Sequence, residues 1–277
     1  MEVKNVKFSE LKSNALETIK PHKKTLYKGA GIFLFVTAIF MLASIILTAN
    51  NHDAAADNID AIRDLLIYPI ILANIAMVAK VYKGETIKAS DALENYSSLK
   101  RFGKALWAYI LPALYILLWT LPVIIITLVI TAIAGISFDD INSFAPSVGA
   151  ICSVVVLVIG VVGISIVKGL QYALNPYILG DNPDISVNES ITLSKELMKG
   201  YKRKFFLFGL SFIGWALLIL PTLGLILIWL LPYCAAATYE FYNHIKREKA
   251  EENKAVSDNE TVNTDENAKA DETTDAE

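Results

Sequence analysis

Apolar residues in this chain are concentrated in long runs that no Asp, Glu, Lys or Arg interrupts. A helix rises about 1.5 Å per residue, so roughly 20 apolar residues cross a hydrocarbon core about 30 Å thick. Six runs of 15 to 30 residues have this character: 29–49, 65–79, 105–134, 148–167, 205–220 and 225–239. The pattern predicts an all-α membrane protein, a polytopic bundle of about six transmembrane helices.

The first run follows a basic leader, residues 1–28. A cleaved signal peptide would have a shorter apolar region, with small residues at positions −3 and −1 of its cleavage site. The end of the run, Leu47-Thr48-Ala49, lacks that pair. We therefore expect the run to remain as the first span of a membrane domain over residues 29–245.

The last two runs are separated by Pro221-Thr222-Leu223-Gly224, a sequence typical of turns. Joined as one helix, the two runs would be about 52 Å long, too long for one crossing. They are therefore predicted to be two short spans in a hairpin. A re-entrant or half-inserted hairpin is the alternative, because 15 or 16 helical residues reach only about 24 Å.

The positions of lysine and arginine predict the orientation, since cationic loops stay on the cytoplasmic side of a membrane. Of the 25 basic residues, 24 lie in the leader, in segments 80–104 and 168–204, and after residue 243, with Arg63 as the exception. Six spans place these segments on one face and both termini in the cytosol. Dividing 105–134 into two half-helices would move Lys195 and the following basic residues outside, so the distribution argues against it.

Two predicted outer loops are acidic. Their carboxylates are Asp53, Asp57, Asp60 and Asp64 in the first loop, and Asp139 and Asp140 in the second. Carboxylates in such loops usually keep the loop in water, and cation binding is the alternative. No residues elsewhere have the spacing of a metal site, and no bound metal is expected.

Three cytosolic segments are predicted to form helices on the membrane surface. In the leader, apolar residues recur at helical spacing opposite charged ones, which is typical of interfacial helices. These apolar residues are Phe8, Leu11, Ala15, Leu16 and Ile19. Asp91 with Glu94, and Ser186 with Glu189, indicate capping boxes at the starts of two further helices.

The C-terminal segment, residues 246–277, is predicted to be disordered in the cytosol. After residue 249 it has ten acidic residues, two lysines and no aromatic residue. Such a composition buries too little apolar surface to offset the entropy lost on folding.

Enzyme signatures are absent from the sequence. It contains no HExxH, Walker A or GxGxxG motif, and Gly209–Gly214 does not have the spacing of a nucleophile elbow. We expect no catalytic residues and no cofactor.

The cysteines and the basic segments each favour one interpretation. Cys152 and Cys234 lie inside apolar runs, which favours buried apolar residues over a disulfide. The basic segments are short and flank apolar runs, so they favour a membrane surface over nucleic acid.

Few polar groups lie inside the predicted spans. None of the spans has a central charged residue, which disfavours a proton-relay pump. Asn74 lies in the second span, and Gln171 and Asn175 lie at the cytosolic end of the fourth. Prolines in membrane helices free backbone carbonyls that could bind a ligand. A small-molecule or lipid transporter with a site at these three residues is therefore the alternative function.

The cytosolic segment before the fifth run is the richest in polar residues. Its candidate interaction surface consists of Asp181, Asn182, Asp184, Lys199, Lys202, Arg203 and Lys204. Basic residues next to a span attract anionic lipids of the cytosolic leaflet. The expected partners are the bilayer, anionic lipids and, as a further candidate, another membrane protein. The leading hypothesis is a non-enzymatic protein that organises or assists other envelope components.

Several stretches occur together in a specific order. They are YILGDNPDIS at 177–186, SKELMKG at 194–200, LSFIGW at 210–215, Pro232-Tyr233 and Phe241-Tyr242. This order resembles the DUF975 family of bacterial integral membrane proteins of unknown function, most clearly over 170–245 and loosely over 90–122. The resemblance implies a multi-pass protein of the bacterial cytoplasmic membrane, and it supplies no catalytic residues.

Overall fold

The computed structural model describes residues 7–133, 135 and 147–274. Over these residues it contains helices and turns but no strand, as the all-α prediction requires. In chain order the helices are α1 (Phe8–Ile19), η1 (Lys20–His22), α2 (Lys23–Ala49), α3 (Asp53–Tyr82), η2 (Ala89–Tyr96), α4 (Leu99–Ile133), α6 (Val148–Tyr172), α7 (Asn175–Asp181), α8 (Val187–Leu197), α9 (Lys202–Leu210), α10 (Ile213–Ala216) and α11 (Leu227–Thr274).

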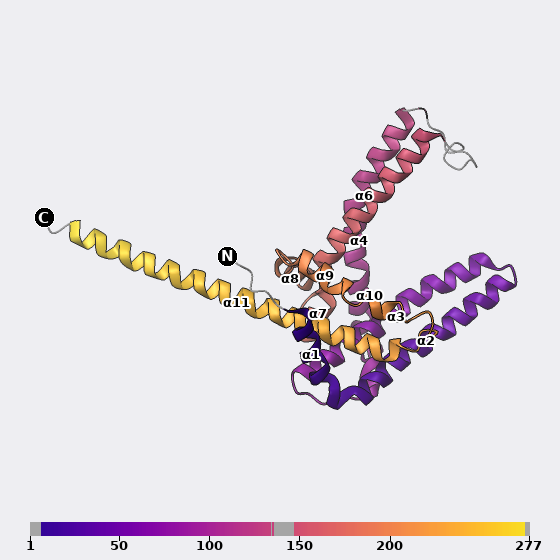
Figure 1. The fold of residues 1–277 in the computed structure, drawn as a ribbon, viewed down its shortest axis with the longest axis horizontal. Helices are drawn as coiled ribbons and strands as arrows, with labels where there is room; N and C mark the ends of the chain where they lie inside the picture. The colour runs from indigo at the N-terminus through magenta and orange to yellow at the C-terminus, as the bar shows by residue number, and fades with distance from the viewer. Residues whose placement is uncertain (1–6, 134, 136–146, 275–277) are drawn as a thin grey trace.

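Two long helical hairpins project from a centre of shorter helices (Figure 1). One hairpin consists of α2 and α3, the other of α4 and α6, and they point in different directions. The shorter helices α1, η2, α7, α8 and α9, together with the helix ends that they contact, are called the junction below. The charged part of α11 leaves the junction on the side away from the hairpin tips.

The turn between α2 and α3 takes only residues 50–52, with Asn51 at a φ of 60°. The segment 53–64, predicted to be an outer loop, is therefore the first part of α3. Its charges pair locally, because Arg63 lies 2.7 Å from Asp60 and 3.0 Å from Asp64, and Asp60 also accepts a hydrogen bond from Ser44 on α2. The other predicted acidic pair, Asp139 and Asp140, lies outside the described residues.

Four helical stretches of the described chain are long and apolar enough to cross a membrane. They are Phe8–Ala49, Asp53–Tyr82, Leu99–Ile133 and Val148–Asp181. They contain the first four predicted spans except residue 134, which lies outside the described residues. Large apolar side chains cover the outer surfaces of both hairpins, and Phe35, Leu42, Ile126 and Ile159 are each more than half exposed. Such surfaces are costly in water and suit the hydrocarbon of a membrane.

Helix α3 lies at the centre of the fold. It contacts α2, η2, α4, α7 and α11, and over half of its most apolar stretch is buried inside the protein, against at most a sixth for the other three. The buried part is its second half, where Ile70, Met77, Val78 and Ala79 are almost fully enclosed. The second half of α3 is therefore a protein core, whereas α2, α4 and α6 mostly face outward.

Small residues allow α4 and α6 to pack closely along their length. Thr120, Thr127 and Thr131 of α4 are buried at helical spacing. A side chain at Gly160 of α6 would lie only 2.7 Å from Val123 of α4. Close packing through small residues is a common way for membrane helices to associate.

The segment 205–239 does not form two continuous helical spans. α9 ends at Leu210, α10 has only four residues, and turns occupy residues 217–226 before α11 begins. Pro221 lacks an N–H donor, and Leu223 and Gly224 have positive φ values of 50° and 81°, which interrupt a helix. The predicted count of six spans is therefore not confirmed.

The leader forms the predicted amphipathic helix, but protein covers its apolar face. Leu11, Ala15 and Ile19 of α1 are buried in one cluster with Tyr242 and Ile245 of α11. Lys12 ties α1 to the turn after α9 by donating to the Ser211 carbonyl at 2.9 Å. Helix α11 therefore covers most of the predicted apolar face, and Leu16 remains exposed. The position of α1 on the membrane surface remains a prediction.

Helix α11 continues through the acidic C-terminal segment to Thr274 (Figure 1). This differs from the disorder that the composition predicts for 246–277. Intrinsic helix propensity explains this difference, because Glu, Lys and Ala favour a helix and an existing helix is easily extended. Disorder of this segment in solution remains a prediction.

Candidate functional site

The junction holds most of the polar side chains that the sequence singled out. One of them, Asp181, ends α7 and is almost buried, with its side chain 14% exposed. Its carboxylate accepts hydrogen bonds from the hydroxyls of Tyr239 at 2.9 Å and Tyr242 at 3.0 Å, and from Lys246 at 2.8 Å. Lys83, just after α3, lies 3.4 Å from the same carboxylate and also donates to the Asp181 carbonyl. One acidic residue thereby joins three helices.

The tyrosines of this cluster stay neutral donors. Burial of the Tyr242 hydroxyl, and then the Asp181 carboxylate beside it, raise the pKa of Tyr242, so the hydroxyl remains protonated at neutral pH. The close approach that makes the cluster possible comes from Gly180, where a side chain would lie 3.2 Å from the Ala76 Cα of α3. Glycine at this position lets α7 pack against the backbone of α3.

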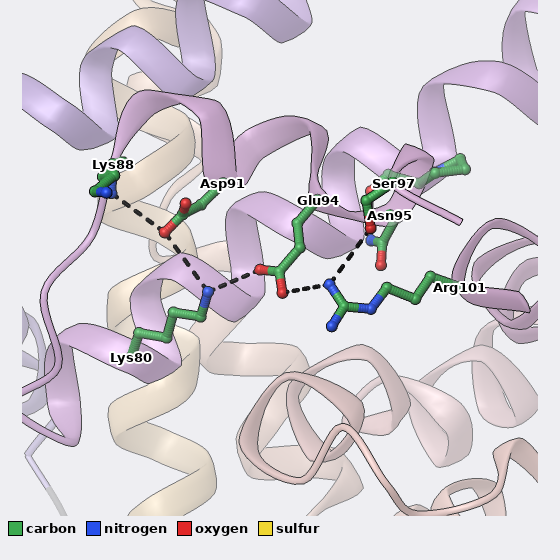
Figure 2. Close-up of polar contacts among 8 residues, drawn as sticks. Lys80, Lys88, Asp91, Glu94, Asn95, Ser97 and Arg101 are labelled. Atoms are coloured by element: carbon green, nitrogen blue, oxygen red, sulfur yellow. Dashed lines mark hydrogen bonds and ion pairs between the residues drawn. The ribbon is translucent and has the colours of Figure 1, made fainter. Parts of the chain in front are cut away.

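A second charged network joins α3, η2 and α4 (Figure 2). Lys80, near the end of α3, lies 2.7 Å from Glu94 and 3.5 Å from Asp91 of η2. Glu94 also accepts from Arg101 of α4 at 2.8 Å. The Asp91 carboxylate in addition accepts from the Lys88 backbone N–H, so Asp91 occupies the third position of the cap. The predicted pairing of Asp91 with Glu94 in one capping box is therefore wrong, because Glu94 faces the two basic residues.

Side chains of η2 also bond to the backbone of α3 beside its proline. Pro69 has no N–H, so the carbonyl four residues earlier, that of Leu65, loses its helical donor. Asn95 donates to the Pro69 carbonyl at 2.8 Å, and the Tyr96 hydroxyl donates to the carbonyl of Leu66. The connection between the two hairpins therefore binds α3 in two ways, by hydrogen bonds to the backbone of α3 and by ion pairs with Lys80.

Asn175 compensates for a proline in α4. Pro112 cannot donate to the carbonyl of Ala108 four residues earlier, and the buried Asn175 amide donates to that carbonyl at 3.2 Å. The Tyr68 hydroxyl approaches the same carbonyl at 3.5 Å, and Ser190 of α8 donates to the Asn175 side-chain oxygen at 2.6 Å. Asn175 is therefore a structural residue that links α4, α7 and α8.

The three residues of the predicted intramembrane polar site are not brought together. Asn74 donates to Ile70 within its own helix and lies against Gly29 of α2, where a side chain would come within 2.5 Å of its oxygen. Gln171 accepts a hydrogen bond from Ser194 through its backbone carbonyl. Asn175 donates to the Ala108 carbonyl of α4, as described above. The polar site expected for a transporter is not assembled from these residues.

A cavity of about 200 Å³ lies between α2, α3, α7 and α11. Among its lining residues, Asn74, Tyr177 and Cys234 have polar side-chain atoms, and the others are apolar. Neither Gln171 nor Asn175 reaches it among the lining residues described. The lining of this cavity suits an apolar ligand and not a charged substrate.

The acidic half of the predicted interaction surface is folded inward. Asp181 is engaged as described, and Asn182 accepts from the Asp184 backbone N–H at 3.3 Å in a local turn. Lys104 of α4 donates to the carbonyls of Pro183 and Ile185 and so holds this turn in place. Asp184 itself is exposed. The expectation that Asp181 faces a partner is therefore wrong, since three helices surround its carboxylate.

The basic half of that surface remains open. Lys199 and Arg203 are exposed, and Lys202 and Lys204 are half-buried. Within the described part of the chain, none of these four residues forms an ion pair. Helix α8, which precedes them, begins as predicted, with the Ser186 hydroxyl accepting from the Glu189 N–H at 3.2 Å.

Around Asp181, sequence reasoning missed five residues. Lys83, Lys104, Tyr239, Tyr242 and Lys246 all contact the segment around Asp181. The last three lie at helical spacing on one face of α11, a pattern that could have signalled a shared contact. The two lysines lie on other helices, with no local pattern that points to Asp181.

A family model described as "Protein of unknown function (DUF975)" matches residues 6–249, most of the chain. The chain belongs to the DUF975 family. The match includes both hairpins, the whole junction and the start of α11, and it ends just before the acidic segment of this DUF975 protein. Comparisons with curated proteins and with solved structures found no match. Family membership therefore confirms the resemblance and leaves the activity of the DUF975 protein to be inferred from its residues.

Proposed function

We propose that this DUF975 protein is a non-enzymatic, multi-pass protein of the bacterial cytoplasmic membrane that organises or assists other envelope components. One observation carries the proposal. Asp91, Glu94 and Asp181 of the junction form ion pairs within the protein, whereas Lys199, Lys202, Arg203 and Lys204 have no acidic partner among the described residues. A surface of this kind suits anionic lipid headgroups or an acidic face of another membrane protein.

In this proposal α2, α3, α4 and α6 span the membrane with the junction in the cytosol. The basic residues support this orientation, because all but Arg63 lie at the junction ends of the helices or beyond them. An even number of spans keeps both termini on one side. The position of α1 and of the charged part of α11, away from both hairpin tips, fits the same arrangement (Figure 1).

The hairpin at 205–239 is proposed to enter the membrane only partly. Leu231 and Pro232 of α11 line the same cavity as Leu26 and Phe33 of α2. Phe33 is five residues, or about 8 Å, beyond Lys28 at the charged end of α2. Helix α11 begins only four residues before Leu231, so its first turns lie within the near half of the bilayer. Exposed leucines in the turn, such as Leu220 and Leu223, would then contact acyl chains.

The transporter alternative has no specific observation in its favour. A transport site for a polar substrate needs polar groups that converge on a cavity. Of the three residues proposed for it, only Asn74 lines the cavity described above. We therefore keep the interaction surface as the proposed functional site.

Reversing the basic surface tests the proposal. The variant Lys202→Glu/Arg203→Glu/Lys204→Glu should lose several-fold of the protein's association with anionic lipid or with a membrane partner, because three attractive charges become repulsive. Retention of phosphatidylglycerol by the detergent-purified protein, and pull-down from native membranes, measure this association.

The matched control is Lys20→Glu/Lys23→Glu/Lys24→Glu, which reverses three exposed lysines at the charged end of α2. Both variants must reach the membrane in similar amounts. Unchanged association of the first variant in both assays, or an equal loss in the two variants, would count against the proposed surface.

A further inference from the structure

Three lysines lie on three helices that pack together beside the α4–α6 hairpin. Lys168 lies near the end of α6, Lys195 in the last turn of α8, and Lys202 at the start of α9. Helix α6 contacts α4, α8 and α9, and α4 also contacts α8, so the helices that bear these lysines pack against one another. None of the three forms an ion pair within the part of the chain that the structure describes. Like charges held together repel one another, and a bound anion would offset that repulsion.

Aromatic rings hold two of these lysines in position. The Lys168 ammonium lies 3.3 Å from the centre of the Trp119 ring, and the Lys195 ammonium lies 5.0 Å from that of Tyr115 and 5.6 Å from that of Tyr172. Tyr115 and Trp119 are four residues apart, so they lie on adjacent turns of the same face of α4. Cation–π contacts orient an ammonium group while leaving its other N–H bonds free for an anion.

The three lysines lie at the depth of lipid headgroups if α6 crosses the membrane. The 20 residues from Val148 to Val167 contain no charge and are about 30 Å long as a helix, and Lys168 comes next. Tryptophan, tyrosine and lysine gather at this level in membrane proteins, and the cytosolic leaflet supplies anionic headgroups. In this placement the two rings and the lysines lie at the level of the lipid phosphates.

We propose that Lys168, Lys195 and Lys202, beside Trp119 and Tyr115, form a binding site for the phosphate of an anionic phospholipid of the cytosolic leaflet. The three ammonium groups come from α6, α8 and α9, so the bound phosphate would join the α4–α6 hairpin to the cytosolic helices. The inference rests on the membrane placement in the proposed function and deepens it by naming the lipid group and the residues that hold it.

Thermal unfolding of the detergent-purified full-length protein tests the site. Phosphatidylglycerol added to neutral micelles should raise the Tm of the natural protein, whereas phosphatidylcholine should not. In the variant Lys168→Gln/Lys195→Gln, the phosphatidylglycerol concentration for half of the shift should rise about tenfold or more, since each lysine near the surface contributes measurably to headgroup binding. The control Lys20→Gln/Lys24→Gln removes two exposed lysines at the charged end of α2 and should keep the natural response.

Three further outcomes decide against the site. An equal loss in both variants would indicate a diffuse charge effect, and loss in Lys168→Arg/Lys195→Arg, which keeps both charges, would indicate damage to the fold. A Tm shift by inorganic phosphate equal to that by phosphatidylglycerol would point to a soluble anion as the ligand. A protein that fails to reach the membrane fraction would instead contradict the proposed function, so the two failures are distinguishable.

Discussion

Asp181 and Asn175 lie at the two ends of α7, and each satisfies groups on other helices. Asp181 accepts from Tyr239, Tyr242 and Lys246 of α11, while Asn175 donates to the Ala108 carbonyl of α4. Both residues are candidates for binding when only the sequence is considered. In the folded protein their polar atoms face the protein interior, where an unpaired partner would be costly.

Replacing Asp181 with asparagine should destabilise the protein by about 1–3 kcal/mol, because Lys83 and Lys246 lose their charged partner. Equilibrium unfolding in neutral detergent measures the effect. Asp184→Asn is the matched control, since Asp184 is exposed three residues later and should change stability by less than about 0.5 kcal/mol. Equal stability of the two variants would show that the Asp181 cluster does not hold the helices together.

At the scale of elements, proline-containing helices are stabilised by the side chains of their neighbours. Carbonyls near Pro69 of α3 accept from Asn95 and Tyr96 of η2, and the carbonyl that Pro112 leaves free in α4 accepts from Asn175. The helices of the two hairpins are thereby fixed to the junction through their backbones. This accounts for polar residues near the spans without a transported substrate.

A double-mutant cycle tests the pairing of Pro112 with Asn175. Asn175→Ala alone should cost about 1–3 kcal/mol, because the Ala108 carbonyl and the Ser190 hydroxyl lose a partner. In the background of Pro112→Ala the new N–H can serve Ala108, so the cost should fall by about 0.5–1 kcal/mol. Asn74→Ala, whose amide bonds within α3, should be additive with Pro112→Ala in the same unfolding measurements. Additivity of both pairs would exclude the assigned role of Asn175.

For the whole molecule, the main question is how the helices cross the membrane. The hairpins α2–α3 and α4–α6 are long enough to do so, whereas α9 and α10 are short and separated by turns from α11. Four spans with a half-inserted hairpin and six spans both leave the termini in the cytosol. The two arrangements differ in the position of the turn at 221–224, which lies inside the membrane in the first and on its outer side in the second.

Labelling of Thr222→Cys, in a background with Cys152→Ala and Cys234→Ala, distinguishes these arrangements. A membrane-impermeant maleimide added to intact cells should not reach residue 222 if the hairpin is half-inserted, and it should label the residue if six spans exist.

Reporter fusions after residues 57, 142 and 190 check the orientation. Residue 190 should be cytosolic and the other two external, and a periplasmic residue 190 would overturn the proposed topology.

Sequence alone predicted the features that depend on neighbours in the chain. The uninterrupted apolar runs predicted the all-α class and the four long helices, the spacing of Leu11, Ala15 and Ile19 predicted α1, and Ser186 marked the start of α8. The order of short motifs also indicated the DUF975 family. These features follow from run length, helical period and capping, which act within a few residues.

Tertiary structure alone decided what covers each face and which polar groups remain free. The apolar face of α1 meets α11 more than 200 residues later, and Asp181 finds its partners 58 to 98 residues away. Lys168 of α6 and Lys195 of α8 lie over aromatic rings of α4 only because both helices pack against α4. Local patterns determine that a residue is amphipathic or charged, but only the packing of distant helices determines its partner, since the free energy of burial depends on the surface that meets it.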